Sequence, residues 1–162
     1  ERLRIVEQLP AWPTHLRSRA RLRTTPKRHF VDPSLAAGSL ALTVDKLIQD
    51  MNYFGLLFES LVLRDIRIYA EIQGGKVFHY RDSNKREVDM IIEYPDGRWA
   101  AFEVKMGFSA REEAASNLLA FTEAVDTKRV GEPSALTVIT ANGFAHRRKD
   151  GVNVVPLGTL SA

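Results

Sequence analysis

The sequence predicts an α/β fold in which helices flank a mixed β-sheet, with a core in the order helix, three strands, helix, strand. Two segments place apolar residues at helical spacing, and four show strand alternation or a short apolar run. The strands of the first three-strand group are separated only by turn residues, so they can pair as an antiparallel meander. The helices are expected at 52–71 and 110–125, and the strands at 76–81, 86–93, 98–106 and 135–140.

The first fifty residues contain only short candidate elements. A strand is expected at 3–7 and another at 28–33, each followed closely by proline, which cannot continue a central strand. Short helices are expected at about 34–37 and 43–49. We therefore treat residues 1–50 as a separate N-terminal segment.

Basic residues are concentrated in that segment. Residues 1–30 carry eight Lys or Arg against two Glu, a net charge of +6, although the whole chain has only +3. This asymmetry favours a polyanion partner, and we predict contact with nucleic acid. A solvated face, an interface to an acidic domain or an exposed edge strand are the alternatives. The arginines expected to bind are Arg17, Arg19, Arg21 and Arg23.

The helix expected at 52–71 carries one unusual charge. Between Met51 and Leu63 the only charged residue is Glu59. A carboxylate on an apolar helix face is costly unless it is paired or bound to a cation. Glu59 therefore either pairs with Arg64 or Lys46, or belongs to a site formed with the following strands.

The second and third strands place acidic side chains opposite their apolar face. Alternation puts Val88, Met90 and Ile92 on one face of the strand at 86–93 and Asp89 on the other. In the strand at 98–106, Glu103 and Lys105 likewise point away from the apolar residues. If residues 94–98 close a hairpin, the two carboxylates and the lysine meet on one sheet face. The apolar residues of the third strand are Phe102, Val104 and Met106.

The C-terminal half continues with a helix and two strands. Ser109 precedes Glu112 by three residues, which is the capping-box pattern at the start of a helix. The apolar strand at 135–140 is expected to be buried on both faces and parallel to the third strand, because the helix at 110–125 returns the chain. A last strand is expected at 152–157.

Two carboxylates beside a lysine are suited to bind a hard cation and to activate water. Oxygen ligands favour Mg²⁺ or Mn²⁺. The ion would be held by Asp89 and Glu103, with Glu59 bound directly or through water, while Lys105 would orient the water or stabilise the developing negative charge. A salt-bridge cluster of Asp89, Glu103 and Lys105 without metal is the alternative.

This arrangement resembles the PD-(D/E)XK nuclease superfamily over roughly residues 52–140. Glu59 corresponds to the helix acid, Asp89 to the strand acid, and Glu103 with Lys105 to the Glu-x-Lys motif. Val88 stands where the proline of the superfamily name would be. The resemblance implies a restriction-endonuclease-like fold, a nuclease-like domain at 51–162 and Mg²⁺- or Mn²⁺-dependent hydrolysis of DNA. Arg81 is expected to reach a phosphate.

A second resemblance rests on six segments spread over most of the chain. They are Leu9-Pro10-Ala11-Trp12, Pro26-Lys27-Arg28-His29-Phe30-Val31-Asp32, Gly55-Leu56-Leu57-Phe58-Glu59, Tyr80-Arg81, Glu87-Val88-Asp89 and Phe102-Glu103-Val104-Lys105. Together they resemble the C-terminal domain of unknown function carried by many prokaryotic AAA-type ATPases. This similarity implies that an ATPase and a winged helix precede residue 1 in a bacterial or archaeal protein, and that residues 1–50 are a linker or remnant.

The chain has no cysteine and no apolar run of about 20 residues, so a cytoplasmic, non-membrane protein is expected. A catalytically inactive module that binds nucleic acid or protein is the alternative function.

Overall fold

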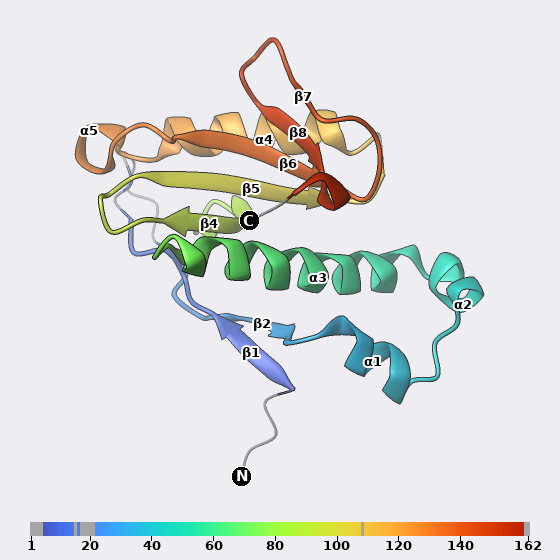
Figure 1. Cartoon of the computed structure of the whole chain (residues 1–162). Helices are drawn as coiled ribbons and strands as arrows, with labels where there is room; N and C mark the ends of the chain where they lie inside the picture. Colours follow the sequence, from blue (N-terminus) through green and yellow to red (C-terminus); the bar gives the residue numbers. More distant parts are fainter. Residues whose placement is uncertain (1–4, 15, 17–21, 108, 161–162) are drawn as a thin grey trace.

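A six-stranded mixed sheet forms the centre of the molecule, as the sequence predicts. The computed structural model describes residues 5–14, 16, 22–107 and 109–160. The strand order across the sheet is β3-β4-β5-β6-β8-β7 (Figure 1). The strands are β3 (Lys76–Arg81), β4 (Glu87–Glu93), β5 (Trp99–Lys105), β6 (Ala135–Thr140), β7 (His146–Arg147) and β8 (Asn153–Pro156).

The strand directions confirm the predicted meander and crossover. β3, β4 and β5 are antiparallel neighbours, whereas β6 pairs parallel to β5 and β8 pairs parallel to β6. The parallel pairing puts Lys105 opposite Thr140 at the carboxyl end of β5 and β6. The short β7 is antiparallel to β8 and forms the far edge.

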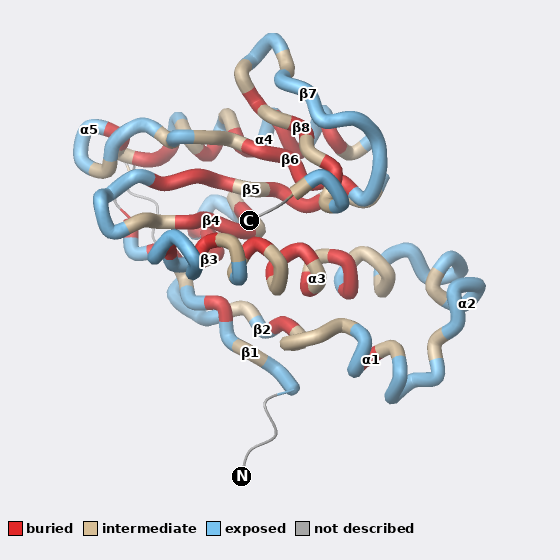
Figure 2. Tube along the Cα trace, viewed as in Figure 1, coloured by how far each residue is buried: buried red, intermediate tan, exposed pale blue. Residues whose placement is uncertain are grey.

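Two long helices cover the sheet on opposite faces (Figure 1): α3 (Met51–Ile72) and α4 (Arg111–Ala124). The predicted apolar positions of α4 are buried against one face, where Leu118 and Phe121 are at most 1 % exposed. Val62 and Ile66 of α3 belong to the core on the other face. Figure 2 shows that the buried chain follows the central strands and the sides of both helices that face them.

A side chain caps the start of the long helix α3, but the predicted capping box of α4 does not form. The Asp50 carboxylate accepts a hydrogen bond from the Tyr53 N–H at 2.9 Å, which caps α3. Ala110 is the N-cap of α4 and makes no side-chain cap bond. Since Ser109 lies one residue too early, Glu112 is free to pair with Arg148 instead.

The N-terminal segment packs across α3 and along β3. β1 (Val6–Leu9) and β2 (Lys27–Phe30) form an antiparallel two-stranded sheet, and β2 contacts α3. The described residues between them reach the outer edge of β3, where the Trp12 backbone N–H donates to the His79 carbonyl at 2.8 Å. Two short helices, α1 (Pro33–Ser39) and α2 (Val44–Gln49), then lead into α3.

A few short elements were not expected from the sequence. They are α5 (Thr127–Val130), the two-residue β7 and a 3-10 turn at Leu157–Thr159. Each is too short for a periodic apolar pattern to reveal it. In the part of the chain that the structure describes, no helix is both long and apolar enough to cross a membrane.

Candidate functional site

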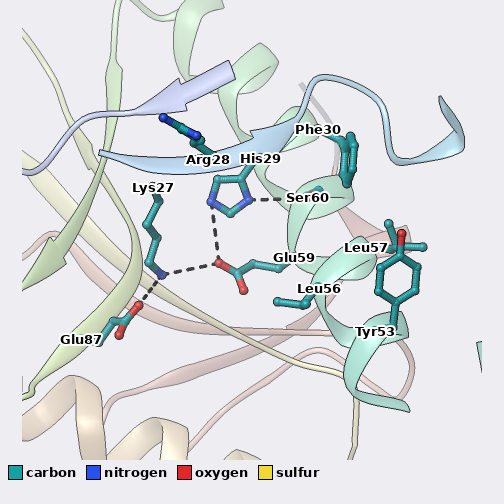
Figure 3. A pocket seen from close by; sticks show the side chains of 10 residues that line it. All are labelled: Lys27, Arg28, His29, Phe30, Tyr53, Leu56, Leu57, Glu59, Ser60 and Glu87. Carbon is teal, nitrogen blue, oxygen red and sulfur yellow. Dashed lines mark hydrogen bonds and ion pairs between the residues drawn. The ribbon is translucent and has the colours of Figure 1, made fainter. Parts of the chain in front are cut away.

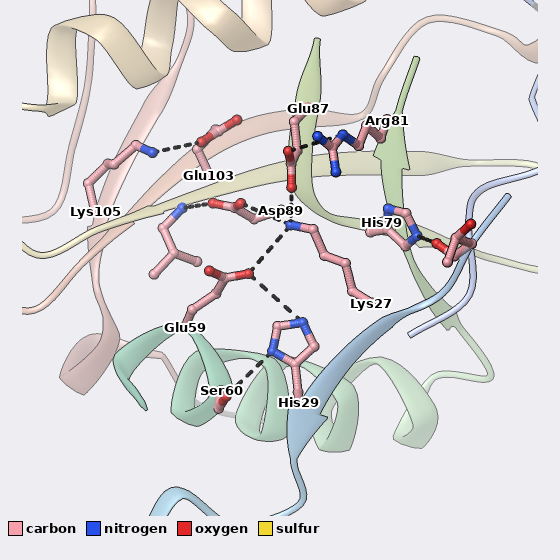
Figure 4. A network of polar contacts seen from close by, with 12 residues as sticks. Lys27, His29, Glu59, Ser60, His79, Arg81, Glu87, Asp89, Glu103 and Lys105 are labelled. Carbon is pink, nitrogen blue, oxygen red and sulfur yellow. Dashed lines mark hydrogen bonds and ion pairs between the residues drawn. The ribbon is translucent and has the colours of Figure 1, made fainter. Parts of the chain in front are cut away.

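The four residues assigned to the site from the sequence lie near one another, but Glu59 lines a different cavity from the other three. Glu59 comes from α3, Asp89 from β4, and Glu103 and Lys105 from β5 (Figure 4). Asp89, Glu103 and Lys105 line one cavity of about 350 Å³. Glu87 of β4 also belongs to this group, and we call the four carboxylates of Glu59, Glu87, Asp89 and Glu103 the acid cluster.

The position of Asp89 depends on where β4 separates from β5. The backbone ladder between these strands ends at the pair Met90–Phe102. Beyond it, the Asp89 carboxylate accepts a hydrogen bond from the Val104 N–H at 2.9 Å. The side chain therefore replaces a backbone acceptor, which fixes the carboxylate next to Glu103.

This separation also corrects one face assignment. Val88 packs in the core on the α4 side, whereas Met90 packs on the α3 side. Simple alternation puts both on one face, but β4 leaves the ladder between them, and the β3 pairing shifts register between Phe78 and Tyr80. Asp89 and Glu103 nevertheless share one cavity.

Glu103 is the most deeply buried member of the acid cluster, with 3 % of the residue exposed. Burial, and next the charge of Asp89, raise the pKa of Glu103 to about 8. The Lys105 Nζ lies 3.3 Å from the Glu103 carboxylate. Burial lowers the pKa of Lys105, but Glu103 and Asp89 outweigh that effect and raise it above its ordinary value.

Lys27 of β2 is the main member of the site that the sequence analysis did not identify. Its Nζ lies 2.6 Å from Glu87 and 3.6 Å from both Glu59 and Asp89. Burial alone would lower the pKa of Lys27, but the nearby carboxylates raise it to about 12. Strand alternation is the sequence pattern that could have pointed to Lys27, because it places Lys27 and His29 on one face of β2.

Glu59 has different partners from those expected. Arg64 pairs with other carboxylates, and the Lys46 ammonium donates to a backbone carbonyl. The Glu59 carboxylate instead faces Lys27 and lies 3.9 Å from the His29 Nε2. No local sequence pattern predicts these two partners, because they lie about thirty positions before Glu59 in the sequence. Burial and the charge of Asp89 raise the pKa of Glu59 to about 7.

Only some of the arginines predicted to contact nucleic acid lie within the described residues. Arg17, Arg19 and Arg21 lie outside the described residues. Arg23 is exposed, and its backbone N–H donates to the Arg81 carbonyl at 2.9 Å, so the two residues are neighbours. The Arg81 side chain is half exposed and lies 3.7 Å from Glu87, at the edge of the acid cluster.

The donor set can be compared with what a divalent cation requires. No group of three His, Asp or Glu side chains within the described ranges has an arrangement that could hold a metal. Asp89 and Glu103 offer two carboxylates at one cavity, of which Glu103 is buried and Asp89 is partly buried. That set fits Mg²⁺, which keeps several waters and is usually held by one or two carboxylates. Glu59 as a further ligand stays a prediction.

Fold and site together define a mixed α/β domain with a partly buried acid cluster between two helical layers. The model of the family described as "Domain of unknown function (DUF4143)" matches residues 54–160, and the chain belongs to this family. No curated protein and no solved structure matches the chain. The matched region contains all four acids and Lys105, whereas Lys27 and His29 precede it.

Proposed function

We propose that this domain hydrolyses phosphodiester bonds of DNA with Mg²⁺ or Mn²⁺ as cofactor. The observation that carries the proposal is the pair of Asp89, which is partly buried, and Glu103, which is buried, beside Lys105 at one cavity. The resemblance of these residues, with Glu59, to the PD-(D/E)XK motif supports the same conclusion. We therefore consider the domain a hydrolase.

Each residue has a role that its position supports. Asp89 and Glu103 hold the cation, with Glu59 contributing directly or through water. The cation supplies a Lewis acid and lowers the pKa of water. Lys105, fully charged beside Glu103, orients the attacking water or stabilises negative charge that develops on the phosphate oxygens.

The wider context follows from the resemblance and the charge distribution. We propose that the domain is the C-terminal part of a prokaryotic, cytoplasmic ATPase, whose ATPase domain belongs to the same chain. The net charge of +6 over residues 1–30 supports binding of DNA through its phosphates. Arg23 and Arg81 would continue this basic surface to the edge of the acid cluster.

A second candidate, a catalytically inactive module for nucleic-acid or protein binding, has one specific observation in its favour. The Lys27 ammonium lies among Glu59, Glu87 and Asp89, where it neutralises charge that a cation would otherwise neutralise. In that case the acid cluster would be a structural salt-bridge network.

A nicking and linear-DNA cleavage assay with Mg²⁺ or Mn²⁺ separates the two candidates. The parent should cut, and Lys105→Ala should cut about 100-fold more slowly because transition-state charge loses its partner. Lys76→Ala is the matched control, since Lys76 is exposed at the start of β3, in the same sheet. Lys105→Ala should still bind Mn²⁺, because lysine is not a ligand.

Two results would contradict the nuclease proposal. If neither the parent nor a longer chain that includes the ATPase cuts DNA, the inactive module is the better description. If Lys105→Ala cuts as fast as the parent, the activity resides elsewhere and the site assignment is wrong.

A further inference from the structure

A second cavity lies on the other side of Glu59, between β2 and α3. It has a volume of about 360 Å³, and we call it the side pocket. One side is apolar and partly aromatic, with Phe30, Tyr53 and Leu57, while Lys27 and Glu59 lie on the opposite side (Figure 3). The side pocket therefore combines an apolar wall with a charged rim shared with the acid cluster.

His29 lines the side pocket and has one ring nitrogen without a hydrogen-bond partner. The residue is 9 % exposed, and its Nδ1 lies 3.4 Å from the Ser60 hydroxyl. Its Nε2 is buried without any hydrogen-bond partner, since Glu59 is too distant at 3.9 Å. In either tautomer Nε2 has one unused donor or acceptor capacity. A buried polar atom of this kind costs about 1–3 kcal/mol unless a ligand or water satisfies it.

We propose that the side pocket binds one unpaired nucleobase of single-stranded DNA. For the chemical class of the partner the inference rests on the proposed function. A nucleobase is planar, so its face suits the wall formed by Phe30, Tyr53 and Leu57. Its edge carries both donors and acceptors, so it can satisfy His29 in either tautomer. The volume lies within the range typical of small-molecule sites.

The rim explains why the base rather than the phosphate is the group bound here. Glu59 and Glu87 face the cavity and repel a phosphate, and Lys27 is already engaged by both. Stacking of a base on an aromatic side chain contributes about 1–3 kcal/mol and needs no positive charge. A base in the side pocket would also bring the adjoining backbone to the acid cluster, because the two sites share Glu59, Glu87 and Lys27.

This placement specifies a substrate class for the proposed nuclease. A base inside a duplex is stacked on both faces, so it must be unpaired or flipped out before it can enter. DNA ends, gaps and single strands are therefore preferred over intact duplex. Stacking also tolerates any base, so little sequence preference is expected.

The test uses a short single-stranded DNA that contains the fluorescent base 2-aminopurine, with EDTA present so that no metal-dependent cleavage occurs. Adding the parent chain should change the fluorescence as the base stacks. Leu56→Glu places a charge at the exposed edge of the apolar wall, and affinity should fall about tenfold. Ile68→Glu, at an equally exposed apolar position of α3 outside the side pocket, makes the same change in net charge and should bind like the parent.

A second matched pair tests the aromatic wall itself. Tyr53→Ala should weaken binding, whereas Tyr69→Ala on the same helix should not. Unchanged fluorescence, or equal binding by both members of either pair, would overturn the inference. An abasic strand of the same length should compete poorly; if it competes equally, only the phosphates are bound. Because cleavage is absent from this assay, failure here is distinct from failure of the nuclease assay.

Discussion

The two lysines that contact the acid cluster occupy very different electrostatic surroundings. Lys27 lies within 3.6 Å of three carboxylates, whereas in the described part of the chain the ion pair of Lys105 is with Glu103. On the Lys27 side, burial would raise the pKa of Glu87. The hydrogen bond and the charge of Lys27 together outweigh burial, so the pKa of Glu87 lies below its ordinary value. On the Lys105 side, the pKa of Glu103 is raised to about 8.

This difference indicates where the acid cluster has charge left to neutralise. Lys27 holds the pKa of Glu87 below its ordinary value, whereas the pKa of Glu59 on the same side stays raised. Asp89 and Glu103 repel each other in a buried setting, and Lys105 compensates only part of that repulsion. An added cation would therefore gain most at Asp89 and Glu103.

The largest expected effect is the loss of the Lys27 charge. Lys27→Met should lower the free energy of unfolding by about 2 kcal/mol at pH 8, because three partly buried carboxylates lose their partner. Urea denaturation measures this, with Lys76→Met as the exposed control. A loss no greater than that of the control would show that Lys27 does not hold the cluster together.

A smaller effect is expected from pH. The raised pKa values of Glu59 and Glu103 mean that the folded chain binds more protons than the unfolded chain between about pH 4.5 and 8. Stability should therefore fall as pH rises through this window. Burial, and next the charge of Lys27, lower the pKa of His29 to about 4, and burial also lowers the pKa of His79; both groups have the opposite sign at acidic pH and fade about one unit above 6.5. The carboxyl effect should therefore dominate from about pH 6.5 to 8.

Within that window the fall should be about 1–2 kcal/mol in the parent. Glu103→Gln removes one of the two titrating groups and should make the slope shallower. Glu132→Gln, at an exposed position after α5, should leave it unchanged. A parent whose stability is flat or rises from pH 6.5 to 8 would contradict the assigned pKa directions.

Local patterns predicted much of this fold, because they arise from local geometry. The helical spacing of Leu118 and Phe121 identified the buried face of α4, and period-2 alternation placed Glu103 and Lys105 together. The capping box failed because a four-residue pattern does not decide which residue ends the preceding turn.

Contacts between distant segments could not be predicted from local sequence patterns. Lys27 joins Glu59 and Asp89 across 32 and 62 residues, and no local period links a β2 residue to α3 and β4. The separation of β4 from β5 at Asp89 likewise depends on the Val104 N–H of the neighbouring strand. The predicted acids were therefore found, but not the lysine that partly neutralises them.

Calorimetric titration with Mn²⁺ at pH 8 tests the central claim that Asp89 and Glu103 form a cation site. The account predicts weak binding by the parent, unchanged in Lys105→Ala and abolished in both Asp89→Asn and Glu103→Gln, since each removes a charged ligand. Mn²⁺ should also raise the melting temperature of the parent by mass action. No heat of binding and no stabilisation of the parent would contradict the claim and leave the acid cluster as a salt-bridge network.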